Sequence, residues 1–436
     1  MTPKPLALLL AAVFLIPPAH AQTPDAVPPP DAAAALSDAP SDAPITLPDA
    51  LRIAAGNNPQ LQSSRFAANA TEGAFVQAGM RPNPEVSFLQ ESFKRQENTS
   101  TALVNQRIEL GGKRGYRMDV AAYGREASLA ALDAQSAAVR ANVIAAFYGL
   151  LAAQKTLSVS EESTAIAQRS TDLVARRVSA GKVSPVEETK ARVALAAVQI
   201  ELTRASTNLS AAREKLANAL GKNWPSRSAS DGGFETLPGM PPLVQLQQRL
   251  EDAPLTRQAV ANLRQSNARI ALERARRIPD VTVSAGYKRV TTGGRADNQA
   301  VVGVSIPLPI FDTNRGAIME ATHNAAKADA DLASERLEQR LALAQAYSGY
   351  ESASQEARRL KGDVLPAARE ALDAMSRGYA LGKFQFLDVL DAQRTLFDAQ
   401  TRYIRALTDA HLAYAELDRL VGTPLDVAAV RQPNQP

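Results

Sequence analysis

Few side chains in this 436-residue chain have the types and spacing that catalysis or metal binding requires. It contains no cysteine, which excludes disulfides, thiolate metal sites and a cysteine nucleophile. Its histidines are His20, in an N-terminal segment, and His323 and His411, which are far apart in sequence. Gly111-Gly112 and Gly293-Gly294 end strand-like runs, where turns explain them, and no phosphate-binding loop or nucleophile elbow is present. The sequence therefore predicts no enzyme, no resident metal and no cofactor.

Asp388 and Asp391 are the acidic pair that merits a functional hypothesis. Residues three apart in sequence share one face of a helix, so two carboxylates would point in the same direction. From the residues alone, the simpler interpretations of the pair are a solvated helix face and, for Asp388, a position at a helix start.

Composition and charge exclude other classes of protein. The chain has 49 basic and 45 acidic residues. Cleavage of an N-terminal leader would remove Lys4 and leave 48 basic residues. No acidic or basic block occurs, so nucleic-acid binding has no electrostatic support. Only 5% of the residues are aromatic, and the high alanine content suits long, closely packed helices better than large globular cores.

The N-terminus has the features of a secretory signal peptide, residues 1–21. An apolar run, Leu6–Ile16, is followed by a small-residue site that predicts cleavage between Ala21 and Gln22. Residues 22–45 are rich in proline, alanine and aspartate, which predicts a flexible linker. We therefore expect the mature chain to act outside the cytoplasm.

The rest of the chain is an internal duplication. Residues 181–221 align with residues 382–422 without a gap, at a constant offset of 201, so that Gly181-Lys182 matches Gly382-Lys383. The predicted organisation is a first repeat at residues 46–222, an inter-repeat linker at 223–241, a second repeat at 242–422 and a C-terminal tail at 423–436.

Each repeat is predicted to contain a helix, two strands and two long helices. The strands, at about 84–110 and 279–309, alternate apolar with polar or small residues. Each run is long enough to cross a membrane as a tilted strand, although an ordinary half-buried hairpin remains the alternative. We expect the polar connections Lys94–Ser100 and Val290–Asn298 to face the exterior of the cell.

Long helices make the other part of each repeat. Residues 115–180 lack proline, so a helix could run for about 65 residues, roughly 100 Å at 1.5 Å per residue. Heptad repeats of apolar and alanine positions, for example Val389, Leu396 and Tyr403, predict close coiled-coil packing. The most apolar stretch, Val143–Ala153, is shorter than the roughly 20 residues of a spanning helix, so we expect no transmembrane helix. A long antiparallel coiled coil without a channel is the alternative.

Specific motifs resemble the TolC family of outer-membrane efflux proteins. Tyr379–Lys383 and Leu387–Gln393 resemble the family's helical-hairpin signature, and Ile108–Arg114 is similar to the strand-to-helix junction of its cobalt-zinc-cadmium branch. Val304–Gly316 matches the second such junction. The resemblance covers about residues 46 to 422.

The resemblance implies a mainly helical chain whose four strands join those of two other copies. The expected homotrimer has a 12-stranded barrel in the outer membrane of a Gram-negative cell and a helical tunnel in the periplasm. It would act as a passive duct for divalent heavy metals, with a periplasmic adaptor (membrane fusion protein) and an inner-membrane RND-type pump. The alternative function is a periplasmic coiled-coil adaptor or structural protein, and a secreted hydrolase is a third, unsupported by any catalytic constellation.

The resemblance also implies roles for particular residues. Gly181, Lys182, Gly382 and Lys383 would form the periplasmic turns, with Tyr379 in the tip gate. Asp388 and Asp391 would form acidic rings at the entrance. Phe384 stands where relatives have an arginine that ties the closed tip, and Lys383 is the candidate substitute for that arginine. Many relatives carry an acylated N-terminal cysteine, so without cysteine we expect no lipid anchor, only contact of the barrel with lipid.

Overall fold

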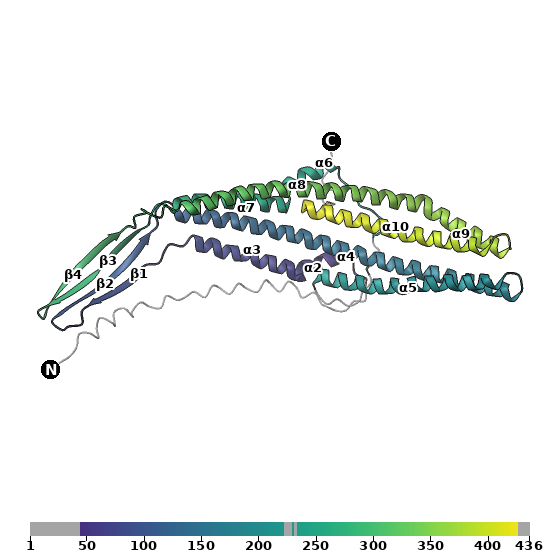
Figure 1. The fold of residues 1–436 in the computed structure, drawn as a ribbon, viewed down its shortest axis with the longest axis horizontal. Coiled ribbons are helices and arrows are strands. Elements are labelled where there is room, and N and C mark those ends of the chain that lie inside the picture. Colours follow the sequence, from purple (N-terminus) through teal and green to yellow (C-terminus); the bar gives the residue numbers. More distant parts are fainter. Residues whose placement is uncertain (1–43, 222–228, 231–232, 426–436) are drawn as a thin grey trace, which may run out of the picture. The chain divides into compact units, whose positions relative to one another are not determined.

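The computed structural model describes residues 44–221, 229–230 and 233–425 (Figure 1). The predicted signal peptide, with Ala21 and Gln22, lies outside the described residues. In chain order the elements are α2 (Leu47–Asn57), α3 (Pro59–Ala78), β1 (Glu85–Glu91), β2 (Glu97–Ile108), α4 (Lys113–Ser179), α5 (Pro185–Leu220), α6 (Leu243–Arg249), a 3₁₀ turn (Leu250–Asp252), α7 (Pro254–Ala275), β3 (Val281–Thr292), β4 (Arg295–Ser305), α8 (Arg315–Arg359), a π-helical turn (Leu360–Val364), α9 (Leu365–Ala380) and α10 (Phe386–Val421).

Two long helical hairpins repeat the same plan. α4 runs for 67 residues, about 100 Å at 1.5 Å per residue, and turns back as α5, while α8 and α9 turn back as α10 (Figure 1). α5 and α10 each contain 36 residues, and both their starts and their ends differ by the 201-residue offset. The duplication in sequence is therefore also a duplication in structure.

The second hairpin differs from the first by the π-helical turn between α8 and α9. Pro366 lies just after this turn, at the start of α9. Proline has no N–H to donate and its ring clashes with the carbonyl four residues earlier. A wider turn accommodates that ring without ending the helix.

The strands form one antiparallel sheet with the order β1-β2-β3-β4. All of its connections to helices lie at the same end, and its hairpin turns lie at the other end (Figure 1). The hairpin connections are shorter than the sequence predicted. In the first hairpin, β2 already begins at Glu97. In the second, Thr292 pairs with Arg295, because Gly293 and Gly294 both adopt left-handed conformations and make a two-residue turn.

One face of this sheet is apolar and exposed. Partners across an antiparallel sheet point to the same side, and the pairing aligns the row Val86, Val104, Ala285 and Val302 with the row Phe88, Ala102, Tyr287 and Ala300. Val302 is 78% exposed in the single chain. The opposite face carries the polar and small residues of the alternation. Both outer strands, β1 and β4, have an unpaired edge in the described chain.

The helices pack through apolar and alanine positions that the heptad pattern predicted. α4 contacts α5, α7 and α10, and α10 also contacts α8 and α9. Ala191 and Ala205 of α5 are buried, which allows the backbones to approach closely. The largest core cluster includes Val143, Phe147, Leu150 and Leu151 of α4, Leu209 and Leu216 of α5, and Ile404 and Leu407 of α10.

One helix in the described part of the chain, α4, is long and apolar enough to cross a membrane by length and composition alone. Length and composition alone are weak evidence for a membrane span, so the absence of a transmembrane helix stays a prediction. The apolar run Val143–Ala153 supplies Val143, Phe147 and Leu150 to the core cluster. Core helices pass the same test, and packing in the core accounts for the hydropathy of this run.

The chain between the repeats is anchored in the middle of the helices. Phe234 is buried, and its carbonyl oxygen lies 2.9 Å from Nε2 of His411 on α10. The imidazole of His411 stacks on the ring of Tyr148, with centroids 3.7 Å apart. On the same inter-repeat segment, the carbonyl oxygen of Pro238 accepts a hydrogen bond from the Tyr350 hydroxyl of α8.

This anchor predicts a pH-dependent stability. Burial lowers the pKa of His411, and the hydrogen bond with Phe234 offsets this only partly. A histidine that resists protonation when folded contributes stability above its ordinary pKa of about 6.5, and that stability is lost as the pH falls below it. The free energy of unfolding is therefore expected to fall from pH 7.5 to pH 5, measured by denaturant titration with circular dichroism.

His411→Gln keeps an N–H donor without a titrating group, so its stability should fall less over the same pH interval. His323→Gln is the matched control, because His323 is exposed and its replacement should leave the pH dependence unchanged. Equal pH dependence in His411→Gln and the wild type would contradict this account of the anchor.

Candidate functional site at the turns of the helical hairpins

The turns at the ends of the two hairpins have the same geometry. Gly181 and Gly382 adopt left-handed conformations, with φ of +68° and +77°, which glycine reaches at little steric cost. The Lys182 N–H donates to the Arg177 carbonyl at 2.9 Å, and the Lys383 N–H donates to the Gly378 carbonyl at 2.8 Å. These are the same helix-ending bond, displaced by 201 residues. Lys182 and Lys383 are both exposed at the turns.

The helices that leave the turns begin with different caps. Ser184 Oγ accepts from the Val186 N–H at 3.3 Å at the start of α5. At the start of α10, the Gln385 N–H donates to Asp388 Oδ2 at 3.0 Å, as part of a capping box. Asp388 therefore has the helix-start role that was one of its simpler alternatives, although its side chain remains exposed.

Asp391 is one turn further along α10 and is also exposed. Among the described residues, its carboxylate has no hydrogen-bond or ion-pair partner. The next helix positions toward the interior, Val389 and Ala392, are buried. The two aspartates thus lie on the solvent side of α10, and only Asp391 is free of a structural task.

Tyr379 connects the two hairpins within one chain. Its hydroxyl donates to Glu187 Oε2 of α5 at 3.1 Å. Arg177 of α4 donates to its carbonyl oxygen and places its guanidinium 4.5 Å from the centre of its ring. Burial, together with the Glu187 carboxylate, raises the pKa of Tyr379 to about 12, so the hydroxyl remains a hydrogen-bond donor near neutral pH.

A small apolar core supports this three-residue connection, here called the Arg177–Tyr379–Glu187 tie. The Tyr379 side chain is buried and its ring lies 5.5 Å from that of Phe386. The surrounding cluster includes Val174, Ala191, Leu372, Val389 and Leu396. The tie therefore joins hairpins that are already packed against each other near their turns.

Phe384 has a different role from the arginine expected at its position. Its ring lies over Gly378, where a Cβ atom would come within 2.1 Å of Phe384 Cδ2. Lys383, considered as a substitute, has no ion-pair or hydrogen-bond partner for its side chain among the described residues. Arg177 supplies the guanidinium at this tip, from the other hairpin.

Sequence reasoning missed Arg177 and Glu187. The 201-residue offset contained a signal for both, because it aligns Arg177 with Gly378 and Glu187 with Asp388. A large cation in one hairpin thus corresponds to a glycine in the other, where the ring of Phe384 takes the space above the backbone. The offset alone gave no indication that the two hairpins would touch at this level.

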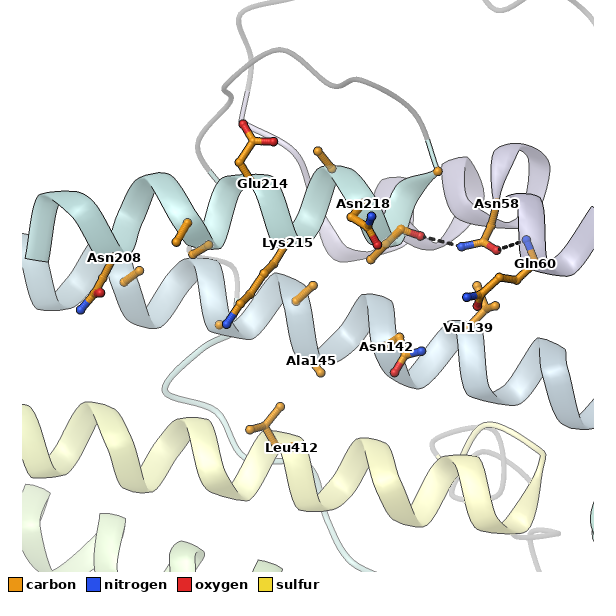
Figure 2. A pocket seen from close by; sticks show the side chains of 18 of the residues that line it. Asn58, Gln60, Val139, Asn142, Ala145, Asn208, Glu214, Lys215, Asn218 and Leu412 are labelled. Carbon is orange, nitrogen blue, oxygen red and sulfur yellow. Dashed lines mark hydrogen bonds between the residues drawn. The ribbon is translucent and has the colours of Figure 1, made fainter.

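Neither the tips nor a groove beside α3 suggests catalysis. The groove, of 1240 Å³, lies between α4 and α5 beside the start of α3, where Asn58 donates to the Ala219 carbonyl and accepts from the Gln60 N–H (Figure 2). Its polar lining consists of Asn58, Gln60, Asn142, Thr156, Asn208, Glu214, Lys215 and Asn218. Within the described ranges, no group of three or more acidic or histidine residues could hold a metal ion.

The duplicated hairpins and the sheet with an exposed apolar face define a class of outer-membrane channel protein. The structure matches that of CusC with a TM-score of 0.76 and 16% identity, over 87% of this chain and 92% of that one. At this level of identity the match concerns the fold.

The family model of the outer membrane efflux proteins matches residues 50–222 and 245–423, so the chain belongs to that family. The two matched segments contain the two helical hairpins. Membership decides between the channel and the periplasmic adaptor in favour of the channel.

Curated relatives agree with this assignment. The chain is 40% identical to the cobalt-zinc-cadmium resistance protein CzcC of Cupriavidus metallidurans, over 87% of this chain and 90% of that protein. It is 27% identical to the nickel-cobalt-cadmium resistance protein NccC of Alcaligenes xylosoxydans xylosoxydans, over 66% of each chain.

Proposed function

We propose that this protein is the outer-membrane duct of a tripartite efflux system and that its cargo is divalent heavy-metal cations. The observation that carries the cargo is the 40% identity to a cobalt-zinc-cadmium resistance protein over nearly the whole chain. The duct itself performs no chemistry in this proposal. Pumping energy and cargo selection belong to an inner-membrane RND-type pump and a periplasmic adaptor.

The sheet supports a trimeric duct. Its apolar face suits lipid, but the free edges of β1 and β4 would leave backbone N–H and C=O groups unpaired in hydrocarbon. Closure with other copies of the chain satisfies them. Two copies would give eight strands, whose interior is filled by side chains, whereas three give a barrel wide enough for an open passage.

The helices support closure by the same copies. In the half of the bundle that carries the hairpin turns, α5 packs on α4, α4 on α10, and α10 on α8 and α9, so α5 and the α8–α9 helix form the two lateral edges there. Val186, Val193 and Ile200 of α5 are exposed at heptad spacing, on the side opposite the buried Ala191 and Ala205. A second apolar seam requires a second neighbour, which we assign to α9 of the next copy.

Cysteine crosslinking tests this assembly cleanly because the natural chain contains no cysteine. Val193 and Ala371 are about equally far from their hairpin turns, and both are exposed. The double variant Val193→Cys with Ala371→Cys should form covalent trimers under oxidation, and each single variant should not. Monomers under all conditions would contradict the trimer, and single-channel recording of the wild-type trimer should show discrete conductance steps.

The proposed entrance lies at the hairpin turns, with Asp388 and Asp391 of three chains around one axis. Six carboxylates in a narrow mouth attract cations, because like charges there are poorly screened. Lys182 and Lys383, exposed at the same turns, are proposed contact points for the adaptor, and photo-crosslinkers at these positions should capture it.

Asp391→Asn is expected to lower the cation-to-anion permeability ratio and to weaken block by multivalent cations about tenfold. Asp388→Asn should destabilise the start of α10 less than a non-polar substitution would, because asparagine retains an acceptor for the Gln385 N–H. Single-channel reversal potentials in a salt gradient provide the measurement. Unchanged selectivity and block in the double variant would make both residues a solvated helix face.

A further inference from the structure

The connections between the sheet and the helices carry an unusual concentration of positive charge. Residues 79–84, 109–117, 273–280 and 306–315, here called the strand–helix junction, contain eight basic and four acidic residues. This excess of four positive charges equals the net charge of the entire chain, +4. All four segments lie at the same end of the sheet (Figure 1).

The acidic side chains of the junction are already engaged. Asp280 Oδ1 accepts from Lys113 Nζ at 2.6 Å, and Glu109 pairs with Arg117. The acids Glu273 and Asp312 complete the set: Glu273 accepts from Arg276 at 2.8 Å and from Asn314 at 3.1 Å, and Asp312 accepts from the Asn314 N–H at 2.9 Å.

Five arginines of the junction remain without such partners. Within the described ranges, no hydrogen bond or ion pair engages the side chains of Arg81, Arg114, Arg274, Arg277 and Arg315, and all five are exposed. Arg114 and Arg315 are equivalent under the 201-residue offset, each at the first turn of a long helix. Free guanidinium groups in this number, with the local carboxylates consumed, are complementary to an anionic surface.

Exposed apolar side chains occur among these arginines. Phe311 is 99% exposed and Leu308 is 75% exposed, and Met80, Ile278 and Ile310 are exposed as well. The junction also marks the end of the apolar face of the sheet. Apolar and arginine side chains that occur together at the edge of a hydrophobic band are typical of the lipid headgroup region. A nucleic acid or an acidic protein would not explain the apolar part.

We infer that the strand–helix junction binds anionic phospholipid headgroups of the inner leaflet of the outer membrane. Arg114, Arg277 and Arg315 contact lipid phosphates, and Phe311 inserts among the neighbouring acyl chains. The inference rests on the proposed orientation, with the helices in the periplasm. It adds a lipid partner whose role is to fix the depth of the duct in the membrane.

Native mass spectrometry of the full-length trimer in detergent tests this inference. The trimer is titrated with phosphatidylglycerol or with phosphatidylcholine of the same acyl chains. Wild type should retain phosphatidylglycerol preferentially, and added salt should weaken that preference. The triple variant Arg114→Gln, Arg277→Gln, Arg315→Gln should bind phosphatidylglycerol roughly a hundredfold more weakly, about fivefold for each arginine.

Arg107→Gln is the matched control. Arg107 lies at the same end of the sheet but pairs with Thr282 on the polar face, so its replacement should leave lipid retention unchanged. Equal retention of the two lipids by wild type would overturn the inference, as would an equal loss in Arg107→Gln and the triple variant. Should the triple variant fail to assemble, the single variant Arg277→Gln provides the same test, with an expected loss of about fivefold.

The outcome is separable from that of the proposed function. A wild-type trimer that conducts ions yet shows no preference for phosphatidylglycerol refutes only the lipid site. A preference for lipopolysaccharide over phosphatidylglycerol also refutes it, because that lipid belongs to the outer leaflet. Absence of both trimer and conductance refutes the duct, and the lipid site with it.

Discussion

Val302→Arg is expected to abolish accumulation of the protein in the outer membrane. Val302 lies on the exposed apolar face of the sheet, in the row with Val104 and Ala285. An arginine facing lipid costs up to about 4 kcal/mol near the bilayer midplane, and a trimer would carry three of them. Membrane fractionation followed by immunoblotting measures the loss directly.

Val301→Arg is the matched control for that substitution. Val301 is the adjacent residue of β4, on the opposite face, where its partner in β3 is Gly286. An arginine there would face the interior of the barrel beside a residue without a side chain. Normal amounts of Val301→Arg in the outer membrane, with Val302→Arg absent, would identify the lipid-facing side. Equal behaviour of the two variants would contradict the assignment of the faces.

Arg177→Ala is expected to produce the largest change in the resting state of the entrance. It removes both the hydrogen bond to the Tyr379 carbonyl and the cation–π contact with its ring. Together these contribute about 2 kcal/mol per chain. This corresponds to a factor of about 30 in the equilibrium constant between connected and separated hairpins. Single-channel recording should show a higher resting conductance and longer open times.

Two further variants identify the cause of that change. Tyr379→Phe keeps the buried ring and removes only the hydroxyl bond to Glu187, so a smaller effect of about fivefold is expected. Arg176→Ala removes a neighbouring exposed arginine and should leave the resting conductance unchanged. A resting conductance that is the same in wild type and Arg177→Ala would show that the tie does not restrain the entrance.

The local sequence determines most of the fold because its patterns are strong and repeated. The heptads that include Leu396 and Leu209 specify buried helix faces, and the alternation around Val302 specifies a strand with one apolar face. The duplication relates the second repeat to the first. Each signal depends on a periodicity of one element, so it is available without knowledge of tertiary contacts.

Contacts between elements far apart in sequence could not be predicted in the same way. Arg177 reaches Tyr379 across 202 residues, and its partner depends on how two hairpins are aligned. The sequence indicates a turn at Gly293-Gly294 but not that it contains only two residues, and it does not indicate the π-helical turn before Pro366. The arginines of the strand–helix junction converge only once the sheet brings four connections to one end.

Export of metal from intact cells tests the central proposal most directly. A strain that lacks this chain but keeps the pump and the adaptor is loaded with radioactive zinc or cadmium, and retained metal is measured over time. We predict that the strain retains more metal than wild type, that the wild-type chain restores export, and that Val302→Arg does not. Equal export with and without this chain would contradict its role as the outer-membrane duct for metal cations.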